Sequence, residues 1–187
     1  SKGSSDPSIT GEQLATIRRE EQLAAGKVLG LEEVVFLDYP DSYLVPSLEL
    51  RRDIAREIRR HRPDILICQN PIRTLSGGRG GGHPDHMAAG EAALAAVFPT
   101  ARDHMTFPEL LQEGLEPHKV REVLVSGTDS PDWWIDVSNY IDIAIEALKQ
   151  HKSQVGDRDV GERMRQWRHQ TGEPHGMKYG EAFKRLV

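Results

Sequence analysis

Short runs of apolar residues alternate along this chain with longer segments whose apolar residues recur at helical spacing. The run 64–71 (DILICQNP) is apolar almost throughout, which is typical of a parallel strand covered on both faces. The alternation indicates an α/β domain with a largely parallel sheet and helices on both faces. The pattern predicts strands at 33–40, 64–71 and 121–127 and helices at 11–30, 46–62, 84–98 and 137–155. Thr10 and Gly30 have the residue types expected of helix caps at the two ends of 11–30.

A chain of 187 residues is most simply one domain, and from about Gly156 onward the sequence indicates a loop and two short helices ending in YGEAFKRLV. No apolar run approaches the roughly 20 residues that span a bilayer. The net charge of -5 gives no reason to expect a nucleic-acid partner. The basic run Arg56–Arg62 is interpreted as a solvated helix face. A single cysteine, Cys68, and a polar N-terminus without a signal-peptide pattern predict a cytoplasmic location.

The segment His83–His86 (HPDH) places two imidazoles and a carboxylate within four residues, directly after the glycine-rich stretch SGGRGGG at 76–82. It follows the most hydrophobic predicted strand, and open α/β sheets collect ligands beyond the carboxyl ends of their strands. A purely structural interpretation is open, because Pro84 suits the first position of a helix and Asp85 complements the helix dipole. The glycines would let backbone approach a substrate and let the loop act as a lid.

A chemical interpretation of HPDH is also open. His83 and His86 are three residues apart, so both can face one region. The positive end of a helix favours neutral imidazole, the form that binds zinc, and a nearby carboxylate can orient such a ligand. One His and one Asp are nevertheless too few, since a catalytic zinc has three protein ligands.

A wider series of motifs resembles the LmbE/PIG-L family of zinc-dependent deacetylases. The series is IRREEQLAAGKVLG, VVFLDYPDSYL, RPDILICQNP, GHPDHMAAGEAAL, ALKQHKSQV and KYGEAF, in that order. The resemblance implies a Rossmann-like version of the α/β architecture. It also implies hydrolysis of an N-acetyl group on an amino-sugar conjugate, releasing acetate and a free amine. The family's substrates contain N-acetylglucosamine or related amides, including intermediates of mycothiol and bacillithiol metabolism.

The resemblance assigns roles residue by residue. His86 would be the zinc ligand, and His83 the general acid or stabiliser of the oxyanion. Asp85 would be the carboxylate that supports His83. Arg18 and Asp41 resemble contacts to the substrate.

The family's opening motif, AHPDDE, does not occur in these 187 residues. It supplies a His and an Asp as zinc ligands and an Asp as general base, so a single Zn²⁺ site would take two ligands from a segment outside this chain. The domain is therefore expected to lack its first strand, helix and strand. An N-terminal fragment of the same protein is one expected partner, and a homo-oligomer is another. His151 and Gln154 match a family signature for which a structural or supporting role is expected.

Two alternatives for function stay open: an amidase acting on a thiol conjugate, and an inert sugar-binding relic of the same fold. Ser76 and Ser126 lack the context of a serine nucleophile. Trp133 and Trp134 are expected to be buried or to form an oligomer contact rather than to stack on a sugar. Four further histidines are expected to be surface or loop residues: His104, His118, His169 and His175.

Overall fold

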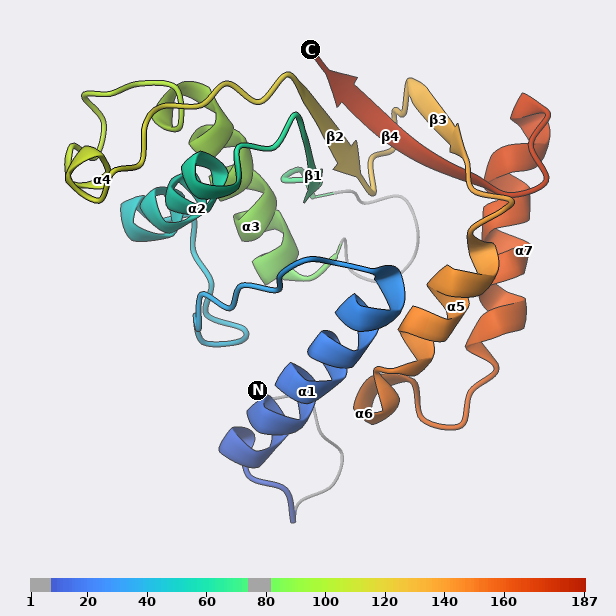
Figure 1. Ribbon diagram of the computed structural model, residues 1–187. Coiled ribbons are helices and arrows are strands. Elements are labelled where there is room, and N and C mark those ends of the chain that lie inside the picture. The colour runs from blue at the N-terminus through green and yellow to red at the C-terminus, as the bar shows by residue number, and fades with distance from the viewer. Residues whose placement is uncertain (1–7, 74–81) are drawn as a thin grey trace. The chain divides into compact units, whose positions relative to one another are not determined.

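The computed structural model describes residues 8–73 and 82–187, so all of the glycine-rich stretch except Gly82 lies outside the described residues. The chain divides into two compact units (Figure 1). Unit 1 comprises the chain up to Asp41 together with Trp134–Glu181, and unit 2 comprises Ser42–Trp133 together with Ala182–Val187. None of the described helices is both long and apolar enough to cross a membrane.

Unit 1 is mainly helical. Its helix α5 packs against α1 and also against α7. α1 begins with a capping box, in which the Gln13 amide N–H donates to Thr10 Oγ1 at 3.2 Å and the Thr10 amide N–H donates to Gln13 Oε1 at 2.9 Å. It ends at Gly30 with a φ of 72°, so both predicted caps are confirmed. The helices of this unit are α1 (Gly11–Leu29), α5 (Ile141–Lys149), α6 (Lys152–Val155), α7 (Val160–Gly172) and η2 (Glu173–His175).

Unit 2 holds the pair of parallel strands that the two apolar runs predicted. β1 (Ile65–Gln69) lies parallel to β2 (Glu122–Ser126), and β2 pairs antiparallel with β4 (Gly180–Leu186). With β3 (Trp133–Asp136) the sheet has four strands in the order β1-β2-β4-β3, which gives a mixed α/β fold. The remaining elements are α2 (Leu48–His61), α3 (Pro84–Ala95), η1 (Ala96–Thr100) and α4 (Glu109–Gln112). The core is formed by Ala55, Ile58, Ala96, Val97, Ala101, Leu110, Val120, Val123 and Val125.

The prediction of a strand at 33–40 is wrong, because the structure has no regular strand there. Val35 and Leu37 are 40% and 37% exposed, and no described strand pairs with this segment. A strand without a ladder partner has little stability of its own, however favourable its composition. The expectation that the run at 64–71 is covered on both faces is also wrong, since Ile65 and Ile67 of β1 are 52% and 63% exposed.

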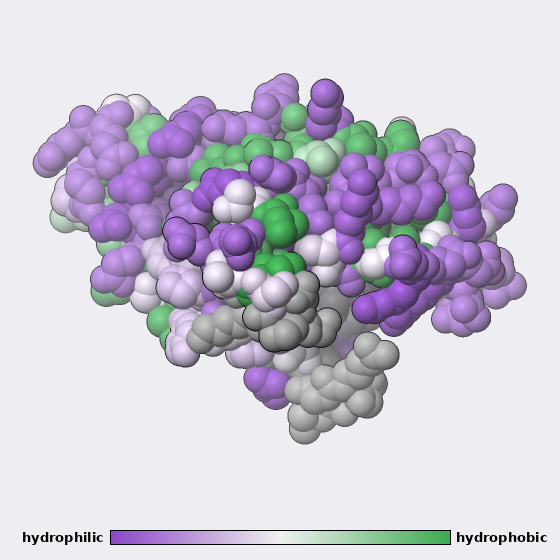
Figure 2. All heavy atoms as spheres, turned by 90° about the horizontal axis from the view of Figure 1, so that it is seen from below, coloured by the Kyte–Doolittle hydropathy of each residue, from purple (hydrophilic) through white to green (hydrophobic). Residues whose placement is uncertain are grey.

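The predicted loop and helices after Gly156 are confirmed by α7 and η2, but the predicted ending is wrong, because YGEAFKRLV contains β4. Val123 to Ser126 of β2 supply the partners that make 183–186 a strand. The helix predicted at 137–155 begins only at Ile141 and is divided, because His151, between α5 and α6, has a non-helical ψ of 54°. Polar residues predominate on the face shown in Figure 2, with smaller hydrophobic patches between them.

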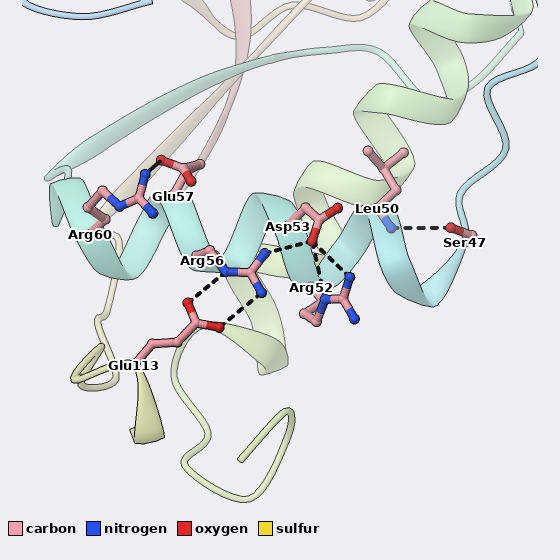
Figure 3. Close-up of polar contacts among 8 residues, drawn as sticks. All are labelled: Ser47, Leu50, Arg52, Asp53, Arg56, Glu57, Arg60 and Glu113. Atoms are coloured by element: carbon pink, nitrogen blue, oxygen red, sulfur yellow. Dashed lines mark hydrogen bonds and ion pairs between the residues drawn. The ribbon is translucent and has the colours of Figure 1, made fainter. Parts of the chain in front are cut away.

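The basic run on α2 is largely neutralised by carboxylates (Figure 3). Arg56 forms a bidentate pair with Glu113, at 2.8 Å and 3.1 Å, and also donates to Asp53 Oδ1 at 2.7 Å. These hydrogen bonds hold the pKa of Glu113 below its usual value. Arg60 pairs with Glu57 at 3.0 Å. Much of the basic run is therefore an ion-paired helix surface, as the solvated-face interpretation expects.

Arg59 departs from that interpretation, because its side chain is buried, with only 2% of the residue exposed. Its guanidinium donates to the backbone oxygens of Thr100 at 3.0 Å and Asp103 at 2.6 Å. A longer hydrogen bond reaches the Ala101 oxygen at 3.3 Å. Burial lowers the pKa of Arg59, with partial compensation by the charges of Asp103 and Glu116. Arg59 thus ties α2 to the segment after η1.

Gly90 sets the close approach of α3 to β1. A Cβ atom at this position would lie 2.2 Å from the Gln69 carbonyl oxygen. Gly90→Ala is expected to destabilise the fold by up to about 2 kcal/mol, because overpacking costs about 1–3 kcal/mol and the higher helix propensity of Ala offsets roughly 1 kcal/mol of that cost. Gly161→Ala on α7 is the matched control, since its Cβ would meet its nearest neighbours at 3.4 Å. Urea denaturation measures the stability of the two variants. Equal unfolding midpoints for Gly90→Ala and Gly161→Ala would contradict the packing argument.

Candidate metal centre

The carboxyl ends of the two parallel strands in unit 2 are tied together by Asn70. Its amide N–H donates to the Ser126 carbonyl at 3.0 Å, and its side-chain Nδ2 donates to the Gly127 carbonyl at 3.2 Å. α3 packs against β1 beside these ends, because Gly90 permits backbone contact with Gln69. Figure 1 shows the amino end of α3 on the side of the sheet toward which the β1 and β2 arrows point. The HPDH segment therefore lies where parallel sheets present ligand sites.

His83 is the N-cap of α3, and its side chain acts as the cap. Nδ1 accepts a hydrogen bond from the Asp85 amide N–H at 3.2 Å. In this arrangement Nδ1 carries no proton, so the neutral ring has its proton on Nε2. The same Nδ1 lies 3.9 Å from Asp85 Oδ1. His83 is exposed, and its Nε2–H is the group it offers to a ligand.

Asp85 is the more buried member of the cluster, and its two carboxylate oxygens differ. Oδ2 accepts a hydrogen bond from the Ser42 amide N–H at 2.7 Å. Oδ1 is buried and has no hydrogen-bond donor within the described part of the chain. A buried carboxylate oxygen without a partner is energetically costly, and a cation removes that cost. The environment of Asp85 therefore suits a bound metal ion.

Asp41 and His86 are two more of the site residues that the sequence predicted. Asp41 belongs to unit 1, whereas His83 and Asp85 belong to unit 2. His86 lies in the first turn of α3, and its ring centroid is 5.4 Å from that of His83. Imidazole nitrogen and carboxylate oxygen are both donors that zinc accepts.

In unit 1 the structure brings together the other residues that the sequence singled out. Arg18 lines a cavity of about 660 Å³ whose wall also includes His151 and Gln154. A clamp between α1 and α6 holds this arrangement: the Ser153 amide N–H donates to Glu21 Oε1 at 2.6 Å, and Ser153 Oγ donates to Glu21 Oε2 at 2.7 Å. Ser153, which lies between His151 and Gln154 in the HKSQ signature, therefore ties this segment to α1.

Sequence reasoning missed two of these positions. Ser42, whose amide binds Asp85, stands inside the quoted motif VVFLDYPDSYL, and Ser153 stands inside ALKQHKSQV. The motifs thus contained both residues, but their partners are 43 and 132 positions away in sequence. A backbone donor such as the Ser42 amide leaves no trace in residue type. Proximity to the motifs was the one available signal.

Other groups considered from the sequence make structural contacts. His118 Nε2 lies 2.8 Å from the Pro63 carbonyl oxygen. The rings of Trp134 and His175 stack with centroids 3.9 Å apart, and the Arg185 guanidinium lies 4.1 Å above the Trp133 ring. Burial raises the pKa of the Cys68 thiol to about 11, so Cys68 stays protonated at neutral pH. A protonated thiol is not a metal ligand.

Comparison with known proteins places these features in a family. The family model of PIG-L, GlcNAc-PI de-N-acetylase, matches residues 1–97, which include the HPDH segment. Diacetylchitobiose deacetylase of Thermococcus kodakarensis is 31% identical over 162 residues, covering 87% of this chain and 58% of the relative. The "Probable N-acetyl-alpha-D-glucosaminyl L-malate deacetylase 2" of Bacillus anthracis is 28% identical over 151 residues, covering 79% and 60%.

A solved structure shows the same fold. N,N'-diacetylchitobiose deacetylase from Pyrococcus horikoshii, complexed with its inhibitor MPG, matches with a TM-score of 0.88 and 27% identity. The match covers 99% of this chain and 68% of that structure. This chain spans about three-fifths of the length of the two curated relatives, 58% and 60%. The family model matches more than half of the residues of this chain. The chain therefore belongs to the PIG-L (GlcNAc-PI de-N-acetylase) family.

Proposed function

We propose that the cluster at the amino end of α3 serves the zinc-dependent hydrolysis of an N-acetyl group on an amino-sugar conjugate, releasing acetate and a free amine. The observation that carries the proposal is the buried Asp85 Oδ1, which lacks a hydrogen-bond donor in the described residues and lies 3.9 Å from His83 Nδ1. Membership of the family supports the reaction class, as do relatives named as deacetylases of diacetylchitobiose and of an N-acetylglucosaminyl malate.

His86 is the proposed zinc ligand of this chain, and it lies in the first turn of α3 together with Asp85. Two further ligands, a His and an Asp, are proposed to come from outside these 187 residues. When bound, zinc lowers the pKa of a coordinated water and polarises an amide carbonyl. Imidazole and carboxylate donors fit this ion, and Asp85 Oδ1 is a negative group already placed in the cluster.

His83 is proposed to act on the reacting amide without binding the metal. Its Nδ1 is held by the Asp85 amide N–H, which fixes the orientation of the ring. Nε2–H is then available to donate a hydrogen bond to the oxygen that becomes negative as the carbonyl is attacked. To give a proton to the departing amine as well, the ring would first have to take up a proton at Nδ1, which would then no longer accept from the Asp85 amide. Passing the Nε2 proton to the amine would return the ring to its neutral form. The Asp85 carboxylate, 3.9 Å from Nδ1, stabilises positive charge on the ring.

Arg18 and Asp41 are the proposed contacts to the polar groups of the substrate. Arg18 is one of the residues that line a cavity of unit 1, and a guanidinium can donate to oxygens of a sugar or of its conjugate group. Asp41 adjoins Ser42 and can accept hydrogen bonds from sugar hydroxyls. The two relatives share an N-acetylated glucosamine unit in their names and differ in what is attached to it, so this unit is the proposed common element of the substrate.

Acetate release tests the proposed function. The purified protein, its intact mass first determined, is loaded with Zn²⁺ and incubated with N,N'-diacetylchitobiose. We expect acetate to appear, to stop appearing when a chelator removes the metal, and to reappear when Zn²⁺ is restored. A calcium-loaded sample controls for unspecific effects of divalent ions. Acetate release that survives removal of zinc would overturn the metal-dependent reaction, and zinc binding without any release would overturn the hydrolysis.

A further inference from the structure

The helix α7 in unit 1 has an exposed face that no part of the proposed reaction uses. Arg163, Gln166, Trp167 and Gln170 are spaced i, i+3, i+4 and i+7, so they lie on one side of the helix. All four are exposed, and Trp167 is 59% exposed. A tryptophan at such spacing normally faces a protein core. Here it lies among amide and guanidinium groups on the outer side of α7.

This face lines a cavity of about 690 Å³ within unit 1. Leu148 of α5, Val155 of α6 and Met164 of α7 supply apolar lining, while Gln154 and Arg158 add polar groups from the other side. Small-molecule sites have volumes in the range of roughly 300–1,000 Å³, and they combine apolar surface with a few polar groups that orient the ligand. The cavity has the size and the mixed lining of such a site.

The chemistry of the lining narrows the kind of ligand. The guanidinium carbon of Arg168 lies 4.3 Å from the centroid of the Trp167 ring, a cation–π contact on one face of the indole. Arg158 and Arg163 form no ion pair among the described residues, so their donors are open to a ligand. The one carboxylate in the lining, Asp159, already accepts from the Glu162 amide N–H at 3.1 Å.

We propose that this cavity, the α7 groove, is a saccharide-binding site. A flat aromatic ring matches the C–H face of a pyranose, and planar amide and guanidinium groups hydrogen-bond to its hydroxyls. The core of a protein interface would instead surround the tryptophan with apolar side chains. Gln166 and Gln170 flank Trp167 on the same side of the helix, where they can reach the edge of a sugar ring that lies on the indole.

The test follows the indole N–H signals of the three tryptophans by ¹H–¹⁵N NMR during sugar titration. Trp167→Phe identifies the Trp167 signal. N,N'-diacetylchitobiose is one probe, and cellobiose, which has no N-acetyl group to lose, is the other. We expect both to shift the Trp167 signal saturably. The double variant Gln166→Ala/Gln170→Ala should bind about tenfold more weakly through loss of two hydrogen bonds, and Gln150→Ala, outside the groove, should bind as the wild type does.

Three outcomes would overturn the proposal that the α7 groove binds a saccharide. The Trp167 signal could stay unshifted with both sugars, or it could shift equally in the double variant. Alternatively, sedimentation could show that Trp167→Ala dissociates an oligomer while sugars leave the Trp167 signal unchanged, which would make this face an interface between copies. Because cellobiose has no N-acetyl group, its binding tests the α7 groove independently of the proposed hydrolysis, which acetate release tests.

Discussion

His86→Ala is expected to abolish zinc-dependent acetate release, because the variant lacks the imidazole proposed as this chain's zinc ligand. Zinc affinity should fall by more than ~100-fold, since even residues that only support a ligand contribute 10–100-fold. Metal content after dialysis and acetate release measure the two effects on the same sample. His104→Ala is the matched control, because His104 is an exposed histidine of the same unit. Zinc content and turnover like those of the wild type in His86→Ala would overturn the assignment.

His83→Ala separates metal binding from acid–base chemistry in the same four-residue segment. Zinc should stay bound, while turnover should fall by roughly 100- to 10,000-fold, the range for a lost acid–base group. His83 Nδ1 also caps α3, so the variant should lose about 1 kcal/mol of stability. His83→Asn keeps a capping side chain without an imidazole, and its turnover should be as low as that of His83→Ala. Recovery of turnover in His83→Asn would show that the cap, rather than the imidazole, is what the reaction needs.

Arg59→Met is expected to be the most destabilising substitution on α2. It leaves the carbonyl oxygens of Thr100 and Asp103, which Arg59 binds at 3.0 Å and 2.6 Å, without their donor in a buried setting. Each unsatisfied buried group costs about 1–3 kcal/mol, so the free energy of unfolding should fall by about 3–5 kcal/mol. Denaturant titration followed by circular dichroism measures the change.

The neighbouring residue provides the control for Arg59. Arg60 keeps 47% of its side chain exposed and pairs with Glu57 one turn earlier on the helix. Arg60→Met should therefore change stability by less than about 1 kcal/mol. Arg59→Lys should recover only part of the loss, since an ammonium cannot reproduce the fork of a guanidinium. Equal destabilisation by Arg59→Met and Arg60→Met would show that burial of the guanidinium is unimportant.

The structure confirms the features that local sequence rules describe. Thr10 and Gly30 bound α1, because a side-chain oxygen and a residue tolerant of positive φ are needed there by the helix itself. The runs around 65–69 and 122–126 are adjacent parallel strands, as apolar runs between helices predict. Pro84 begins α3 and places His83 at its cap. Each of these depends on residues within about one helical turn or one strand.

Several of the failed predictions involve partners distant in sequence. The segment 33–40 has strand-like composition but pairs with no described strand, whereas 180–186 becomes a strand because β2 lies beside it. Arg59 looks like its basic neighbours in sequence, but it is buried because carbonyls 41 and 44 residues away converge on it. Strand formation and burial depend on what lies alongside, and residue type does not report that.

For the candidate site, the sequence by itself determined which side chains stand together: His83, Asp85 and His86 are neighbours in any fold that begins a helix at Pro84. The family resemblance rested on an ordered series of six motifs, one of which contains these residues, and the comparisons confirm the family. The tertiary structure decided that the Ser42 amide takes one Asp85 oxygen and that the other is buried without a donor. It also left Trp167 exposed on α7. The physical reason is that desolvation and hydrogen-bond supply are properties of the surroundings of a group, and those surroundings exist only after distant segments have packed.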